Sequence, residues 1–328
     1  MRRSVTAGIL ECMDTTETNT LAALSVQLAS AVAMAAASIT YVDAHPRRDA
    51  SGIAWDDHHV LSVDHAIERE DDIELLLEGG AKANATLVGR DAATDVALLQ
   101  TKAALVPARR ADSASLAVGN LVLAVGRDED AQPGASFGVI SSLDGPWRTW
   151  RGGSVDRFIR PDVNLHAGLS GGALIDVAGA VIGMNTWGLS RRTALTLPIS
   201  TLERVVDELR AGGRVRRGYL GVALQSVRLP EALRVAHGLV ARRAAIVIDV
   251  AAGGPAEKAG ITIGDVVLAF GGTPINDVDD LQRALGGVAL GSAQSLRILR
   301  GGEQREVRAI VAEQPRDAAG RSAGNGDE

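Results

Sequence analysis

Cysteine and aromatic residues are nearly absent from this sequence of 328 residues. It contains a single cysteine, Cys12, and aromatic residues make up only 3% of it. One cysteine cannot form an internal disulfide, and it cannot supply the thiolate set of a structural zinc site. A disulfide-stapled domain and a Cys-ligated zinc centre are therefore excluded. We expect no metal ion and no cofactor, and since no nucleotide-binding glycine motif is present, no ATP is implied.

The sequence also lacks an excess of positive charge. Its 34 Lys and Arg residues face 40 Asp and Glu residues, which gives a formal net charge of −6. A nucleic acid is therefore not an expected partner. Hydrophobic residues reach 46%, enough to bury a core, and the length favours two domains. With 37 glycines and few aromatics, the chain is predicted to be rich in β-structure.

A clear targeting segment is missing as well. The basic start at residues 1–3 is followed by only a short apolar stretch and then by acidic residues, which makes a poor secretory signal. Residues 21–42 carry no charge and could span a bilayer, but most of them are Ala, Ser and Thr. We favour a packed helix that leads into a strand, and a membrane anchor is the alternative.

The order of patterns along the chain predicts two domains between two tails. Residues 1–20 are predicted to be a flexible tail, and residues 21–38 a helix. Short apolar runs broken by turn residues at intervals of about 8–12 residues then indicate a β-barrel or sandwich. A helix ending at Gly212-Gly213 closes the domain 21–212, and mixed strands and helices make a small α+β domain of 213–315. The polar, glycine-rich residues 316–328 are predicted to be disordered.

The strongest local signal for chemistry is the sequence Gly168-Leu-Ser170-Gly-Gly172. A serine flanked by glycines can occupy a tight turn that exposes its hydroxyl. The backbone N–H groups of Gly168 and Ser170 can then point into one small volume, as an oxyanion hole requires. Taken alone, such a string is more often a flexible turn.

Two further residues favour a catalytic role for Ser170 over a merely flexible turn. A serine hydroxyl becomes a useful nucleophile when a histidine accepts its proton and a carboxylate orients that histidine. His65 follows the apolar run Val60–Val63, and Asp95 precedes the apolar run Val96–Leu99. The chain order His, Asp, Ser is that of chymotrypsin-type enzymes and not that of subtilisin or the α/β-hydrolases.

With these residues in place, the sequence resembles the HtrA/Deg family of trypsin-like serine proteases, which carry a PDZ domain after the protease domain. Residues 60–67 are similar to the family's (I/V)LTNNHVV, and residues 89–99 to its G-x-D-x-x-T-D-(L/V)-A-(V/L)-L. Residues 162–174 resemble D-A-x-I-N-x-G-N-S-G-G-x-L, and residues 181–186 resemble (V/I)-I-G-(I/M)-N-T. The likeness covers roughly residues 25–315. The family's Asn before the serine is replaced by Leu169, and its Asn four residues before the serine by His166.

The resemblance implies a mainly β fold, with two antiparallel β-barrels of the chymotrypsin type followed by a small α+β PDZ domain. It implies an ATP-independent serine endopeptidase that cleaves unfolded or exposed protein segments in protein quality control. The implied roles are general base for His65, orienting carboxylate for Asp95 and nucleophile for Ser170, with the N–H groups of Gly168 and Ser170 as oxyanion hole. The alternative is a non-proteolytic peptide-binding scaffold or holdase with an inactive protease-like domain.

The same resemblance indicates where substrates bind. Asn164 stands where trypsin-like enzymes carry an aspartate, and with its neighbour Leu165 it suggests a small or medium apolar residue on the acyl side of the cut. Residues Thr186, Trp187 and Gly188 are expected to pair with an extended substrate.

The C-terminal domain carries its own predicted site. Tyr219-Leu220-Gly221-Val222 resembles the carboxylate-binding loop of PDZ domains, and residues 253–267 resemble their S-P-A-x-x-A-G-L-x-x-G-D-x-I stretch. The expected partners are therefore unfolded protein or peptide substrates, and C-terminal peptides at the PDZ domain. Family members assemble as trimers through N-terminal aromatic contacts, so a homotrimer is an expectation, although Tyr41 is the only aromatic residue before Trp55. The resemblance favours the periplasm or cell envelope.

Overall fold

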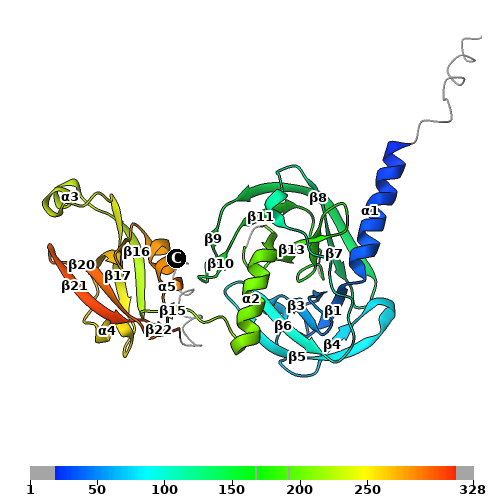
Figure 1. The fold of residues 1–328 in the computed structure, drawn as a ribbon, viewed down its shortest axis with the longest axis horizontal. Helices are drawn as coiled ribbons and strands as arrows, with labels where there is room; N and C mark the ends of the chain where they lie inside the picture. The colour runs from blue at the N-terminus through cyan, green and yellow to red at the C-terminus, as the bar shows by residue number, and fades with distance from the viewer. Residues whose placement is uncertain (1–18, 167, 191–192, 315–328) are drawn as a thin grey trace, which may run out of the picture. The chain divides into compact units, whose positions relative to one another are not determined.

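The structure is a computed structural model and describes residues 19–166, 168–190 and 193–314 (Figure 1). These residues form two compact units divided after Gly213, with the short segment 148–153 grouped with the second unit. Of the tail predicted for residues 1–20, residues 1–18 lie outside the described residues. Asn19 and Thr20 are described: the Asn19 side chain caps the first helix by accepting from the Ala22 N–H at 3.1 Å. The tail predicted for 316–328 also lies outside the described residues.

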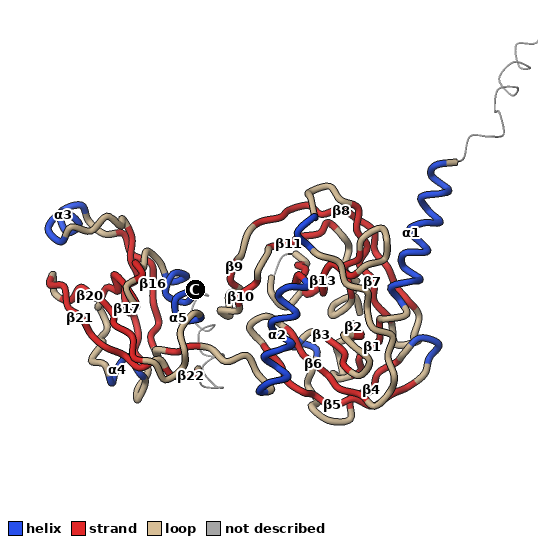
Figure 2. Tube along the Cα trace, in the orientation of Figure 1, coloured by secondary structure: helices blue, strands red, loops and turns tan. Residues whose placement is uncertain are grey.

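The first unit contains two closed six-stranded barrels, which confirms the predicted fold class. Strands alternate with short turns (Figure 2), and the apolar residues Val96–Leu99 are all buried, so that this part of β6 is covered on both of its faces. The first barrel has the order β1-β2-β3-β6-β5-β4. Its strands are β1 (Ile39–Asp43), β2 (Ala50–Ala54), β3 (His59–Ser62), β4 (Ile73–Leu76), β5 (Lys82–Asp91) and β6 (Val96–Thr101).

The second barrel has the order β11-β14-β13-β12-β7-β8, and every pairing in it is antiparallel. A two-stranded sheet lies between β8 and β11 in the sequence and consists of β9 (Trp147–Arg148) and β10 (Ser154–Val155). The barrel strands are β7 (Leu121–Arg127), β8 (Pro133–Asp144), β11 (Phe158–Asp162), β12 (Ala173–Ile175), β13 (Val181–Thr186) and β14 (Leu195–Pro198).

Helices begin and end the first unit. Helix α1 (Thr20–Ala36) matches the helix expected for residues 21–38 and leads directly into β1. No helix within the described ranges has both the length and the hydropathy needed to cross a bilayer. Helix α2 (Ile199–Gly212) buries one apolar face against strands of both barrels and ends at Gly213, whose φ of +70° is a left-handed cap. Three short 3₁₀ turns, η1 (Asp64–Ala66), η2 (Glu78–Gly80) and η3 (Ser113–Ser115), interrupt the loops.

The second unit is a small α+β domain with its own core. Its sheet has the order β16-β17-β18-β20-β21, so that β16 and β21 are the edge strands, and β19 pairs with β18. A separate pair joins β15 to β22. The elements are β15 (Gly218–Tyr219), β16 (Val222–Arg228), α3 (Glu231–His237), β17 (Arg243–Val250), α4 (Pro255–Lys258), β18 (Val266–Phe270), β19 (Thr273–Pro274), α5 (Val278–Gly286), β20 (Ala293–Arg300), β21 (Glu303–Ile310) and β22 (Ala312–Glu313).

Candidate active site and peptide-binding site

The structure brings His65 and Asp95 into contact across the first barrel. His65 lies on η1, just after β3, and Asp95 directly precedes β6, which pairs with β3. The Nδ1 atom of His65 lies 2.8 Å from Oδ2 and 3.0 Å from Oδ1 of Asp95, and the His65 backbone N–H donates to Oδ1 at 3.0 Å. The Asp95 carboxylate therefore holds both the ring and the backbone of the histidine.

Asp95 has an unusual backbone conformation. Its φ is +59°, a left-handed conformation that aspartate tolerates better than most residues, and its side chain is fully buried. The preceding loop is stabilised locally, because the Asp91 side chain accepts from the Thr94 hydroxyl at 2.6 Å and from the Thr94 N–H at 3.2 Å. A buried carboxylate needs such a rigid setting and several donors.

Thr186 supplies one of those donors. Its hydroxyl donates to Oδ2 of Asp95, and the Gly188 N–H in turn donates to the Thr186 hydroxyl oxygen at 2.8 Å. A Cβ atom at position 188 would lie 2.3 Å from the Asp95 carboxylate, so only glycine fits there. The sequence analysis assigned Thr186, Trp187 and Gly188 to substrate pairing and missed this contact. A hydroxyl at this point in the motif could have signalled it.

The local structure differs from the expected substrate edge. Thr186 ends β13 and is buried, with Leu195 of β14 as its partner. Trp187 lies in a bend and is 41% exposed, and Gly188 lies in a turn. In this conformation Trp187 and Gly188 do not continue the strand, because the Gly188 N–H is turned back to the Thr186 hydroxyl.

A second carboxylate, Asp64, lies next to the catalytic candidates. Its buried side chain accepts from the Nε of Arg90, whose Nη2 donates to the carbonyl oxygens of Asp64 at 3.1 Å and of Ile67 at 3.0 Å. Arg90 therefore ties together both ends of the turn that carries His65. Burial raises the pKa of the Asp64 carboxyl, and the Arg90 guanidinium only partly opposes this. The motif comparison did not single out either residue of the pair.

The serine loop is fastened to the first barrel by Ser51 of β2. The Ser51 N–H donates to the Ser170 carbonyl oxygen at 2.9 Å, and its hydroxyl donates to the Gly168 carbonyl oxygen. Gly171 has a φ of +81°, and a Cβ there would lie 2.1 Å from the Ser51 carbonyl oxygen. The glycine after Ser170 is thus required by both its backbone conformation and the close approach of β2.

Ser170 itself is buried, at 7% exposed, and its Oγ has no hydrogen-bond partner in the described part of the chain. The backbone N–H groups of Gly168 and Ser170 donate to no acceptor among the described residues either. The Leu169 N–H, by contrast, donates to the His166 carbonyl oxygen at 3.1 Å. One hydroxyl and two amide donors are therefore left free on the same loop, which is the set that acyl transfer uses.

The two replacements in the serine motif have different environments. Leu169 is 4% exposed and lies in the core of the second barrel, whereas His166 is exposed. The two residues expected to influence substrate specificity also differ in their environments. Leu165 is 6% exposed within the same core, while Asn164 faces outward and its N–H donates to the Ser136 hydroxyl at 3.1 Å.

Arg127 is a further residue that supports the site, and it lies outside the histidine, aspartate and serine motifs. The side chain is 3% exposed and donates to the carbonyl oxygens of Ala36 at 2.6 Å, Ile39 at 2.7 Å and Ala131 at 2.5 Å. Burial lowers the pKa of its guanidinium. Its backbone N–H donates to the Ser51 hydroxyl at 2.8 Å, so the strand that carries Arg127 also supports the serine loop.

In the second unit, the predicted carboxylate loop connects β15 to the edge strand β16. Leu220 is buried in the core, and Gly221 has a φ of +77°. The N–H groups of Leu220 and Gly221 donate to no acceptor within the described ranges, while their carbonyl oxygens accept from Ala256 and Ala251, each at 2.8 Å. Fixed carbonyls and free N–H groups suit the binding of an anion.

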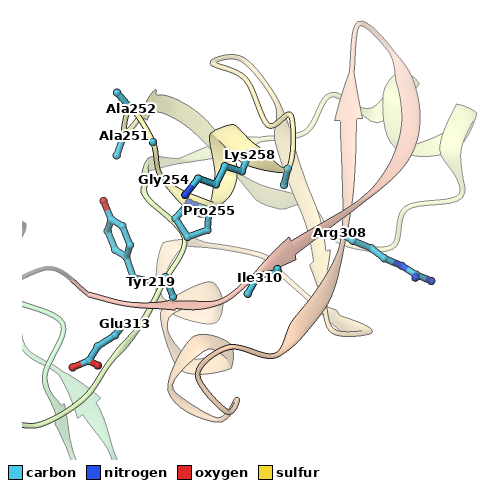
Figure 3. A pocket seen from close by; sticks show the side chains of 12 residues that line it. Tyr219, Ala251, Ala252, Gly254, Pro255, Lys258, Arg308, Ile310 and Glu313 are labelled. Carbon is cyan, nitrogen blue, oxygen red and sulfur yellow. The ribbon is translucent and has the colours of Figure 1, made fainter.

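Tyr219, at the start of this loop, lines a pocket of about 480 Å³ that faces α4 and the end of β21 (Figure 3). Its apolar side includes Pro255 and Ile310, and Lys258 and Glu313 supply opposite charges. In Figure 3, the Arg308 side chain extends away from the other labelled side chains.

Each of the two units matches a known protein family. Residues 50–184 match the trypsin-like peptidase domain, and residues 218–311 match the PDZ domain. A relative from Halomonas elongata, named "Probable periplasmic serine endoprotease DegP-like", is 34% identical over 281 residues, which cover 84% of this chain and 58% of the relative. A relative of the same name from Pseudomonas fulva is 33% identical over 267 residues, covering 80% and 55%. The chain thus spans little more than half the length of these relatives.

The chain is also similar to solved structures of proteases. The HtrA-type protease AlgW with a decapeptide has a TM-score of 0.73 and 26% identity, and the match covers 88% of this chain and 99% of AlgW. The serine endoprotease from Yersinia pestis has a TM-score of 0.71 and 26% identity, covering 88% and 98%. With a trypsin-like peptidase domain, one PDZ domain and these relatives, the chain belongs to the HtrA/Deg family of trypsin-like serine proteases.

Proposed function

We propose that this chain is an ATP-independent serine endopeptidase in which His65, Asp95 and Ser170 form the catalytic triad. The observation that carries the proposal is the buried Asp95 carboxylate held 2.8 Å from Nδ1 of His65. This contact fixes the tautomer in which Nε2 is free to accept a proton. Ser170 Oγ makes no hydrogen bond to His65 among the described residues, so the proposal requires it to come within hydrogen-bond distance of Nε2 during the reaction.

The chemistry follows from these groups. Ser170 Oγ attacks the scissile carbonyl carbon while its proton passes to His65 Nε2, and the N–H groups of Gly168 and Ser170 stabilise the oxyanion. The protonated histidine, stabilised by Asp95, then gives its proton to the leaving amine, and the acyl-enzyme forms. Water, deprotonated by the same histidine, attacks the ester carbonyl carbon. The histidine then returns this proton to Ser170 Oγ as the C–Oγ bond breaks, and the carboxylic acid product leaves.

The proposed substrates are unfolded or exposed protein segments in an extended conformation. Pairing of such a segment with Thr186, Trp187 and Gly188 requires the last two residues to leave their present bend and turn. Near Asn164 and Leu165, we expect the site to accept a small or medium apolar residue on the acyl side of the cut. The relatives are named endoproteases, which favours proteolysis over the non-proteolytic scaffold.

For the PDZ domain, we propose that Tyr219-Leu220-Gly221-Val222 binds the free carboxylate of C-terminal peptides. The free N–H groups of Leu220 and Gly221 support this, and so does the edge position of β16, to which a peptide can add as a further strand. A homotrimer and a periplasmic or cell-envelope location complete the proposal, and the location rests on the names of the relatives.

The test is casein degradation by the wild-type chain and by Ser170→Ala, together with labelling by a fluorophosphonate probe. Ser170→Ala should lose about 10⁴–10⁶-fold in rate and all labelling. The exposed Ser200 on α2 offers a matched control, and Ser200→Ala should keep both. A wild-type chain that binds C-terminal peptides but neither labels nor cleaves would support the scaffold instead.

A further inference from the structure

Three arginines gather at one end of the edge strand β16. A hollow of about 510 Å³ is lined by Arg228 and Ser226 of β16, by Arg243 of β17 and by the preceding residue Arg242. We call these four residues the arginine hollow. All three arginine side chains are exposed, so their charge is available to a ligand from solvent.

The arginine hollow lies on the face of the sheet that α5 covers. Ser226 pairs with the core residue Ala245, and Arg228 pairs with Arg243. Because side chains alternate along a strand, Ser226, Arg228 and Arg243 lie on the same face of the sheet as Ala245. The core around Ala245 also contains Leu281 of α5, which packs in the same cluster as Val222 and Leu224. Along β16, alternate residues on this face thus run from the carboxylate loop at Val222 to Arg228.

The three arginines of the hollow form no ion pair with an acidic group of the described residues. In the described part of the chain, the side chains of Arg228, Arg242 and Arg243 take part in no ion pair or hydrogen bond. Five other arginines of the domain are paired: Arg300 with Asp265, Arg283 with Asp280, Arg305 with Glu303, and both Arg214 and Arg216 with Glu313. Arg234, Arg297 and Arg308 have no such partner among the described residues, but none of them lines the hollow. Three free guanidinium groups around one hollow form a local excess of positive charge in a chain whose net charge is negative.

The position of this charge relative to the carboxylate loop sets what it can recognise. A peptide that adds antiparallel to β16, with its carboxylate at residues 219–222, runs toward Arg228 as it proceeds upstream from its C-terminus. Arg228 lies six positions after Val222 on β16, which is about 20 Å at 3.4 Å per residue. Ligand residues about four to seven positions before the C-terminus would therefore face Ser226, Arg228 and Arg243.

We propose that the arginine hollow is an upstream subsite of the PDZ domain, selecting C-terminal peptides that carry Asp or Glu four to seven residues before the free carboxylate. Guanidinium groups bind carboxylates with two parallel hydrogen bonds, which gives geometric as well as charge selectivity. The inference rests on the proposed carboxylate-binding role of Tyr219–Val222. It adds a second requirement on the ligand, beyond the free C-terminus.

The test measures binding of fluorescent peptides of about ten residues to the full chain carrying Ser170→Ala, by anisotropy. Two peptides share the last three residues and differ only upstream, with Glu in one and Gln in the other. The Glu peptide should bind about five- to tenfold more tightly in low salt, and the difference should shrink at about 0.5 M salt. Arg228→Gln combined with Arg243→Gln should remove the preference, whereas Arg297→Gln on β20, an exposed arginine outside the hollow, should keep it.

The possible results separate the inference from the function on which it rests. Equal binding of both peptides overturns the subsite and leaves the carboxylate loop intact. Failure of both peptides, or binding unaffected by amidation of the C-terminus, overturns the proposed PDZ function. Binding of a single-stranded DNA oligomer that depends on the same arginines, without discrimination between the peptides, would assign the hollow to nucleic acid and overturn the proposal.

Discussion

Removal of Arg90 should destabilise the peptidase unit more than removal of its partner Asp64. The Asp64 side chain is only 6% exposed, whereas that of Arg90 is 35% exposed. Arg90→Met leaves a buried carboxylate without its cation, and two carbonyl oxygens on the His65 turn lose their donor. Asp64→Asn leaves an arginine that can turn toward solvent. The two halves of the ion pair are therefore not equivalent.

The magnitudes follow from this asymmetry. Breaking a buried pair from the arginine side costs about 3 kcal/mol of unfolding free energy, at the lower end of the usual range because Arg90 is partly exposed. Asp64→Asn should cost about 1 kcal/mol, since a neutral amide replaces the charge. The double variant should lose about 2 kcal/mol, less than the sum of the two single variants, because no unpaired charge remains.

Acid should reduce the cost of Arg90→Met. Burial raises the pKa of Asp64 above its ordinary value in the folded state, so the folded chain binds this proton more tightly than the unfolded chain does. For such a group, stability falls as pH rises through the interval between the two pKa values. Without Arg90 the folded-state pKa rises further, so the deficit of Arg90→Met should be larger at about pH 7.5 than at about pH 5.

Urea denaturation followed by tryptophan emission is the appropriate assay, in a Ser170→Ala background that prevents self-cleavage. Trp55, Trp147 and Trp187 lie in the first unit, so the emission reports mainly on its unfolding. The reasoning is refuted if Arg90→Met and Asp64→Asn cost the same, if the double variant loses the sum of both, or if the deficit does not change with pH.

Two further predictions concern Thr186 and Asp265. Thr186→Val removes the hydroxyl that donates to Asp95 and should lower kcat about tenfold with little change in KM, while Thr186→Ser should restore kcat; casein and peptide kinetics decide this. In the PDZ domain, burial opposes ionisation of Asp265, but the hydrogen bonds from Arg300 lower its pKa below the ordinary value. The pair therefore stabilises the domain above about pH 4 and loses that effect in stronger acid, and Asp265→Asn should cost about 1–3 kcal/mol at neutral pH. Hydrogen exchange of β17 and β18 amides measures this loss, and equal protection in Asp265→Asn would contradict it.

Much of the architecture was predictable because it depends on local patterns. The predicted alternation of short apolar runs with turns is that of two barrels, and α2 ends at the predicted glycine pair. Prediction failed where hydrophobic pattern carries little information. The strand β21 is mostly exposed, so its place at the edge of the second sheet depends on pairing with β20 and not on an apolar pattern of its own.

The sequence by itself determined the chemistry available to this protein. The order of His65, Asp95 and Ser170, the glycines around the serine and the Tyr219–Val222 loop pointed to acyl transfer and carboxylate binding, because these functions require particular residue types at short spacings. The scarcity of cysteine and aromatic residues meant that aliphatic packing had to hold the barrels together.

Only the tertiary structure decided which other residues support that chemistry. Ser51 fastens the serine loop, Arg127 joins three buried carbonyl groups, and Thr186 and Arg90 steady the Asp95–His65 pair. Each of these contacts joins residues from different strands or loops, and most of the partners lie far apart in the sequence. Barrel closure alone brings such partners together, so no local pattern could have revealed them.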